Sequence, residues 1–175
     1  MKQTLILFFL ITSIQVLGQL PDSTYPTKDG IINYSEIIKV DSLNKNGLYI
    51  NAKKWIVNNY KSAKNVIQLD DKEAGEIILK GNFDVYYDKA LGMPIAVNVN
   101  HVFKISVRDF KFKYEFTDFV IDRTEALYND FLKNNSPLYH KKAVRKFREA
   151  LDKQIKLYLA DFKAAMITNN QFDDF

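Results

Sequence analysis

Two consecutive stretches of strict alternation, over residues 97–107 and 110–121, restrict the fold of this chain more than any other feature. Every second residue of the first stretch is apolar or histidine, and the residues between are polar apart from Val102. After Arg108-Asp109 the pattern resumes. Such alternation is typical of antiparallel strands with one buried and one solvated face. The sequence therefore predicts an antiparallel sheet whose buried face comprises Val97, Val99, His101, Phe103, Ile105, Val107, Phe110, Phe112, Tyr114 and Phe116.

The preceding part of the chain predicts three more strands and one helix. We expect strands over residues 31–40, 65–69 and 76–87, with a hairpin loop at 70–75 and a turn at 91–94. Between the first two strands, Ser42 or Asn46 is expected to cap a helix that runs to about Tyr60. Its apolar stripe, which includes the only tryptophan, is Leu48, Ala52, Trp55, Ile56 and Tyr60.

Helical patterns fill the last third of the chain. Thr124 is expected to cap a short helix to about Lys133, and Ser136-Pro137 resembles an N-cap followed by proline at the first helical position. The long helix that follows has apolar residues at steps of three and four, namely Val144, Phe147, Leu151, Ile155, Tyr158, Phe162 and Met166.

The predicted order is β-α-β-β-β-β-α, an α+β domain with an antiparallel sheet of about five strands and helices packed on one face. Two known folds have this arrangement: one half of a TBP-like saddle, and the helix-grip fold. The first is packed solid between the sheet and the long helix, whereas the second encloses a ligand cavity there.

Residues in the middle of the chain form a further pattern, namely Tyr34-Ser35-Glu36, Val40, Leu48, Ala52, Trp55-Ile56, Ser62 to Ile67, Asp71, Gly75 to Ile78 and Lys80-Gly81. In these residues the chain resembles the DUF4468 family of exported bacterial proteins of unknown function with a TBP-like fold. The resemblance covers roughly residues 32–121 and implies the fold, but no activity, cofactor or site residue.

The N-terminus predicts export to the periplasm or the exterior. Lys2, an apolar run over residues 5–11 and Val16-Leu17-Gly18 form a signal peptide over residues 1–18, the alternative being an uncleaved anchor. No later segment is long and apolar enough to cross a bilayer. The remaining chain divides into a linker over 19–29, the α+β core over 30–122, a C-terminal helical segment over 123–167 and a frayed tail over 168–175.

Composition excludes several kinds of chemistry. The chain has no cysteine, hence no disulfide, thiolate metal site or cysteine nucleophile. A formal net charge of +4 is too small for the basic stripe of a nucleic-acid-binding domain. We therefore expect no nucleic-acid partner.

Candidate catalytic and metal-binding residues are few. His101 falls on the apolar face and is expected to be a core or pocket-edge histidine, while His140 is expected to be solvated. Asp70, Asp71 and Glu73 lack the spacing of a calcium loop and fit a charged hairpin tip. No catalytic residue, metal or cofactor is therefore predicted.

Two groups of basic residues are the candidate binding surfaces. A cluster at the start of the long helix suits a solvated face with ion pairs four residues apart, or a contact with anionic lipid or glycan. The first group is Lys141, Lys142, Arg145, Lys146 and Arg148, and the polar face of the sheet carries Lys80, Asn82, Lys104, Lys111 and Lys113.

These observations favour a non-catalytic binding module of the cell envelope that contacts a protein or an anionic envelope component. One alternative is a carrier for a small apolar ligand with a cavity under the long helix. Another is a hydrolase with catalytic groups near His101.

Overall fold

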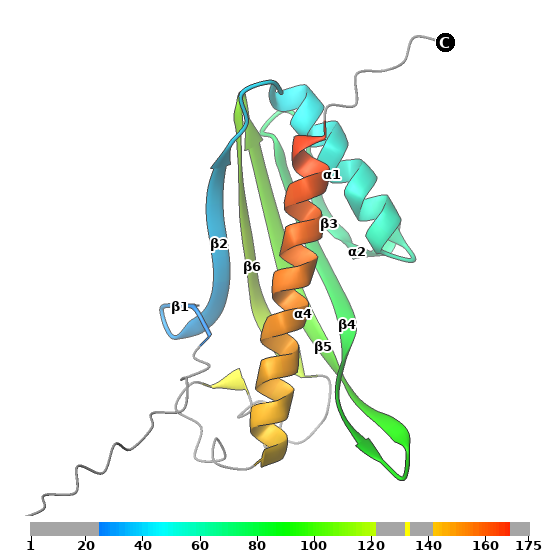
Figure 1. The fold of residues 1–175 in the computed structure, drawn as a ribbon. Helices are drawn as coiled ribbons and strands as arrows, with labels where there is room; N and C mark the ends of the chain where they lie inside the picture. The colour runs from blue at the N-terminus through cyan, green and yellow to red at the C-terminus, as the bar shows by residue number, and fades with distance from the viewer. Residues whose placement is uncertain (1–24, 122–131, 134–141, 169–175) are drawn as a thin grey trace, which may run out of the picture.

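The computed structural model describes residues 25–121, 132–133 and 142–168 of the 175-residue chain (Figure 1). In these ranges no helix has the length and apolar character needed to span a bilayer. The predicted signal peptide and the helix expected to begin at Thr124 lie outside the described residues, as does most of the predicted tail.

Six strands form one antiparallel sheet in the order β1-β2-β6-β5-β4-β3. The α+β prediction is therefore confirmed, with a two-residue strand in addition to the five expected. The elements are β1 (Thr27–Lys28), β2 (Ile31–Lys39), α1 (Lys45–Asn59), α2 (Ala63–Val66), β3 (Ile67–Asp71), β4 (Glu76–Ala90), β5 (Met93–Arg108), β6 (Lys111–Ile121) and α4 (Lys142–Ile167).

The central strands follow the predicted alternation closely. On β5, each predicted inward residue from Val97 to Val107 is buried. The turn expected over residues 91–94 is tighter, because Met93 and Pro94 already pair with Ala90 and Lys89. One prediction on this face is wrong: Phe110 is 56% exposed and has a φ of 61°, since it completes the turn between β5 and β6.

Strand β2 returns beside β6, the strand farthest from it in sequence, and Lys39 pairs with Lys111. Glu36, the one charged residue on its inward side, lies at the rim of the core. Its carboxylate accepts hydrogen bonds from the Tyr114 hydroxyl at 3.0 Å and from Lys163 Nζ at 2.5 Å. These contacts lower the Glu36 pKa, chiefly through Lys163, and connect β2 to α4.

The N-cap of helix α1 lies two residues from each of the alternatives that the sequence offered. Asn44, rather than Ser42 or Asn46, is the N-cap, and its side chain accepts a hydrogen bond from the Gly47 amide at 2.9 Å. The strand expected from Asn65 begins only at Ile67, because Asn65 lies in the short helix α2.

Residues 25–29, at the end of the predicted linker, contribute to the domain. Tyr25 is buried, and Thr27 and Lys28 form strand β1 through a two-residue turn at Asp29-Gly30.

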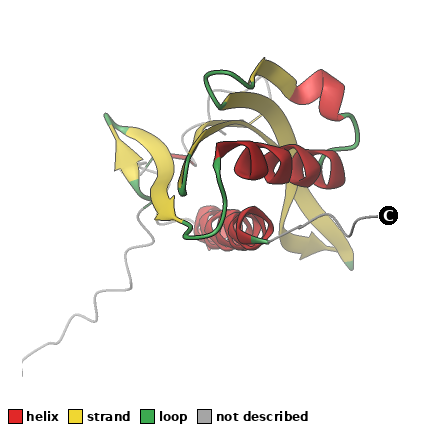
Figure 2. Ribbon diagram, turned by 90° about the horizontal axis from the view of Figure 1, so that it is seen from above, coloured by secondary structure: helices red, strands yellow, loops and turns green. Residues whose placement is uncertain are grey.

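Helices α1 and α4 lie side by side on the same side of the sheet (Figure 2). Aromatic rings fill the space between the helices and the sheet: Phe162 on α4 packs edge-on against Trp55 and Phe103, with ring centroids 4.9 Å apart in both pairs. Tyr158 stacks on Phe116 at 5.4 Å. This packing corresponds to the solid-core alternative, and Trp55 has the core role predicted for it.

Candidate functional site

The sheet has an outer face, turned away from α1 and α4, on which three cationic side chains lie in one row. Strand pairing places Lys39 on β2 opposite Lys111 on β6, and Lys111 opposite Arg108 on β5. All three residues are exposed. We call Lys39, Lys111 and Arg108 the cationic row.

The cationic row forms no ion pair with the described residues, although Asp109 follows Arg108 in the chain and Glu76 lines a hollow beside the row. No hydrogen bond or ion pair joins its side chains to any of the residues that the structure describes. Like charges directly opposite each other on neighbouring strands destabilise a sheet. The row is therefore a place where an anion from outside would relieve repulsion.

Apolar side chains border the row on two sides. Phe110 is exposed in the turn that joins Arg108 to Lys111, and Ile37, two residues before Lys39, is 64% exposed. A shallow hollow of about 370 Å³ lies beside Ile37, Arg108 and Lys111. Its lining includes Ile37, Glu76, Ser106, Arg108, Lys111 and Lys113.

The other predicted cations of the outer face differ in their ion pairs and in the residues opposite them on neighbouring strands. Lys113 forms an ion pair with Glu115, which lowers the Glu115 pKa. Lys104 lies opposite Glu115, and Lys80 lies farther along the face opposite Val102. The outer face is thus mixed in charge at its centre and purely cationic at the row.

The basic cluster at the start of α4 does not form a single face. Lys142 is exposed, Arg145 is half-buried, and Lys146 forms an ion pair with Asp88 on β4 at 2.7 Å. Asp152, expected to pair with Arg148, instead pairs with Lys156 at 2.6 Å. Lys141 lies outside the described residues.

Arg148 is wrongly predicted as part of a solvated surface, because its side chain is fully buried. Its guanidinium lies 4.3 Å from the centroid of the Tyr25 ring, and its Nη1 donates to the Lys133 carbonyl at 2.7 Å. The sequence showed only a basic residue in a basic run. Its burial depends on Tyr25, which is distant in the chain.

His101 is a core histidine, as predicted. It is 2% exposed, and its Nε2 lies 3.0 Å from the Tyr60 hydroxyl. Burial lowers its pKa to about 4, so the ring is neutral at pH 7. Its ring neighbours are aromatic, including Phe116 at 4.7 Å and Phe83 at 5.1 Å. A carboxylate partner of the kind that a hydrolase would need is not among its contacts with described residues.

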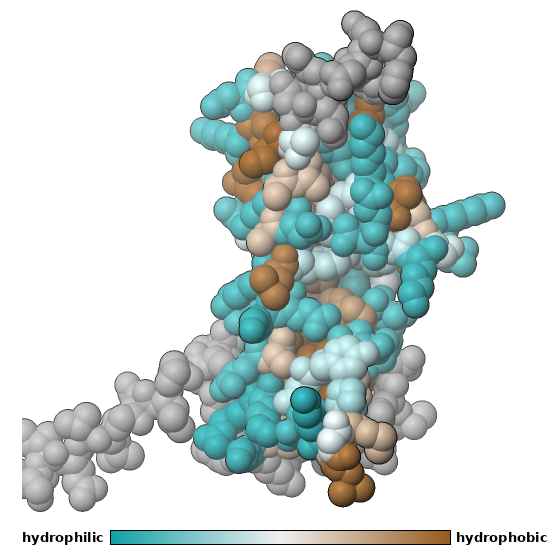
Figure 3. All heavy atoms as spheres, turned by 45° about the vertical axis from the view of Figure 1, so that its right-hand side comes forward, coloured by the Kyte–Doolittle hydropathy of each residue, from teal (hydrophilic) through white to brown (hydrophobic). Residues whose placement is uncertain are grey.

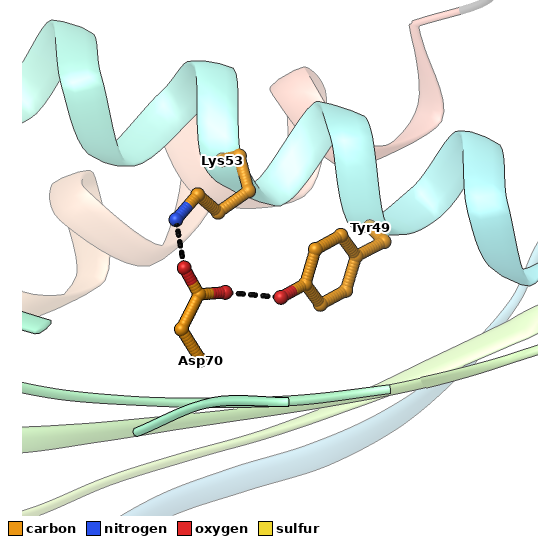
Figure 4. Close-up of polar contacts among 3 residues, drawn as sticks. All are labelled: Tyr49, Lys53 and Asp70. Carbon is orange, nitrogen blue, oxygen red and sulfur yellow. Dashed lines mark hydrogen bonds and ion pairs between the residues drawn. The ribbon is translucent and has the colours of Figure 1, made fainter. Parts of the chain in front are cut away.

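The acidic residues of the predicted hairpin tip serve a structural contact. Asp70, on β3, receives Lys53 Nζ at 2.5 Å and a hydrogen bond from the Tyr49 hydroxyl, both from α1 (Figure 4). Lys53 and then Tyr49 lower the Asp70 pKa. Asp71 caps the turn by accepting from the Ala74 amide at 2.8 Å. Within the described ranges, no group of three or more acidic or histidine side chains is arranged to hold a metal ion.

Sequence reasoning found Lys111 but missed Lys39 and Arg108. The interruption of the alternation at Arg108-Asp109 is the signal that could have placed Arg108 at the end of its strand, close to the start of the next strand at Lys111. Lys39 could not be found in this way, since nothing local shows that β2 lies beside β6.

Comparisons with known proteins agree with this architecture. A family model described as a domain of unknown function (DUF4468) with TBP-like fold matches residues 34–122. The structure is similar to a TBP-like protein from Parabacteroides distasonis ATCC 8503, with 17% identity and a TM-score of 0.65 over 81% of this chain and 96% of that one.

It is also similar to a DUF4468 family protein from Bacteroides ovatus ATCC 8483, with 15% identity and a TM-score of 0.68 over 84% of this chain and 92% of that one. No functionally curated protein matches the sequence. At these identities the solved structures establish the fold alone.

Proposed function

Starting from the fact that the chain belongs to the DUF4468 family, whose function is unknown and whose fold is TBP-like, we propose that it is an exported, non-catalytic binding module of the cell envelope. It recognises an acidic segment of a partner protein through the cationic row. The observation that carries this proposal is the alignment of Lys39, Lys111 and Arg108 on three adjacent strands without ion-pair partners among the described residues.

The composition of the surface around the row favours a protein partner. Arginine and aromatic residues are enriched in protein interfaces, and Arg108 and the exposed Phe110 are two residues apart at the end of β5 and in the turn that follows it. Carboxylates of an acidic segment would pair with the row, while an apolar side chain of the same segment would contact Phe110 or Ile37. The predicted signal peptide supports a role outside the cytoplasm.

The alternative carrier and hydrolase functions receive less support. The aromatic rings of Trp55, Phe103 and Phe162 occupy the space where a ligand would lie. His101, the residue considered as the base of a hydrolase, is buried, and burial lowers its pKa.

Binding of a fluorescently labelled peptide rich in glutamate and phenylalanine tests the proposal. The double variant Lys39→Gln/Lys111→Gln is expected to bind about tenfold more weakly, since each exposed ion pair contributes up to about 1 kcal/mol. Raising the salt concentration is expected to weaken binding to the unmodified protein and to have a smaller effect on the variant.

Two controls separate this surface from overall charge. Lys61→Gln/Lys64→Gln removes the same charge from exposed positions near the end of α1 and should bind like the unmodified protein. A peptide with glutamine in place of glutamate should not bind. Equal loss in both double variants would contradict recognition by the cationic row.

A further inference from the structure

The hairpin formed by β4 and β5 extends beyond the rest of the sheet. Strand β6 pairs with β5 only from Val99 onward, and β3 pairs with β4 only over Glu76–Leu79. Among the described residues, the strand pairing of the distal part of the hairpin, from Tyr86 and Ala96 to its tip, is therefore confined to β4 and β5. Figure 1 shows it projecting past the other strands at the lower end of the molecule.

The tip of this hairpin is apolar and exposed. Leu91 is 99% exposed and Met93 is 66% exposed. Figure 3 shows hydrophobic atoms at the lower end of a surface that is largely hydrophilic around them, where the hairpin ends. A leucine so completely exposed contributes nothing to the packing of the domain.

Leu91 also has an unfavourable backbone conformation. Leu91 and Gly92 both have positive φ, at 51° and 81°, as a type I′ turn requires. The chain has the same turn at Asp29-Gly30, with φ values of 53° and 78°, and there it uses a residue that tolerates this region. Local stability would be better served by Asn or Asp at position 91, so leucine at this turn indicates a role for its side chain.

Lysine side chains from the start of α4 lie close to the hairpin near its tip. The ion pair between Lys146 and Asp88 holds the start of α4 against it, and the rings of Tyr87 and Phe147 pack at 5.6 Å. Lys146 and, more weakly, Lys142 lower the pKa of Asp88. Lys89 follows Asp88 on β4, and Arg145 precedes Lys146 on α4, so further cations lie next in sequence to this ion pair.

We propose that this end of the molecule docks on the surface of a bilayer that contains anionic lipid, with Leu91 and Met93 entering the interface. An apolar tip flanked by lysine and arginine is the arrangement that binds such surfaces, because buried apolar area and attraction to anionic headgroups act together. Two apolar side chains and a few cations give weak, reversible attachment. This site goes beyond the proposed function, since it uses a different surface from the cationic row.

Vesicle sedimentation tests the proposal, with phosphatidylcholine vesicles that either contain or lack phosphatidylglycerol. Leu91→Asn is expected to lower the partition coefficient about tenfold, the value of burying one leucine side chain. Its thermal unfolding midpoint should equal or exceed that of the unmodified protein, because Asn suits the turn. Lys142→Gln/Arg145→Gln should remove the preference for phosphatidylglycerol. Lys39→Gln/Lys111→Gln should leave vesicle binding unchanged.

Tryptophan labels in the full chain show which part of the protein contacts lipid. Affinity of residues 1–18 for lipid would therefore not be mistaken for docking of the hairpin tip. In Leu91→Trp, brominated lipid is expected to quench the new fluorescence, whereas in Val57→Trp, at an exposed position on α1, it should not. Trp55 is buried and serves as a constant background. Equal quenching at the two positions, or unchanged partitioning of Leu91→Asn, would overturn the proposal.

Discussion

Lys39 and Lys111 lie directly opposite each other on adjacent strands, although about seventy residues separate them in the chain. Arg108 continues the row on the next strand. The fold thus brings three like charges together, and none of them has an ion-pair partner among the described residues. Such a surface costs stability, and a bound anion would offset the repulsion.

Lys111→Gln is expected to raise the free energy of unfolding by about 0.5–1 kcal/mol at low salt, because it relieves repulsion from both neighbouring strands. Chemical denaturation measures the change, which should shrink as salt is added. Lys113→Gln is the matched control, two residues away on the same strand and face. It loses the ion pair with Glu115 and should not stabilise the protein. A loss of stability in Lys111→Gln would contradict the repulsion.

Local pattern predicted most of the sheet, and pairing between distant strands accounts for what it missed. The alternation from Val97 to Val107 depends only on neighbouring residues, so it could be read directly. The pairing of β2 with β6, and with it the position of Lys39, is a non-local property. Arg148 was misassigned for the same reason, since the Tyr25 ring that covers it comes from the other end of the chain. Phe110 was misassigned because it lies in the turn between β5 and β6, where the alternation of the strands does not hold.

The identity of the N-cap residue of α1 gives a second prediction. Asn44→Ala is expected to lower the free energy of unfolding by about 1 kcal/mol, since it removes the acceptor for the Gly47 amide. Ser42→Ala and Asn46→Ala, the two caps that the sequence alone suggested, should have effects below about 0.5 kcal/mol. Thermal unfolding of the three variants distinguishes them, and equal losses would argue against Asn44 as the cap.

Gly81 lies where β4 passes close to the Tyr60 ring. A Cβ at this position would lie 2.4 Å from Tyr60 Cε1 and 3.0 Å from His101 Nε2. Gly81→Ala is therefore expected to displace Tyr60 and to lower the free energy of unfolding by about 1–3 kcal/mol.

Gly47→Ala, which introduces the same methyl group into α1, serves as its control. Its Cβ would meet only the flexible Leu43 side chain at 3.3 Å and the Asn44 side chain, and alanine favours the helix. Denaturant titration should show no loss for this variant. Equal stability of both variants would show that the Tyr60 contact tolerates the methyl group.

The depressed pKa of His101 predicts a dependence of stability on pH. The folded state resists protonation until about pH 4, whereas the unfolded chain protonates near 6.5. Stability is therefore fully present above pH 6.5 and is lost as the pH falls towards 4, by about 3 kcal/mol in total. His101→Gln should have a smaller slope over this interval, measured by denaturation at several pH values. An identical slope in both proteins would show that His101 is not the responsible group.

Backbone amide chemical-shift mapping with the glutamate- and phenylalanine-rich peptide tests the binding account most directly. We predict that the largest perturbations fall on Lys39, Arg108, Phe110 and Lys111, and that they diminish with added salt. Perturbations centred elsewhere, or none at peptide concentrations that saturate binding, would contradict the assignment of the cationic row as the recognition surface.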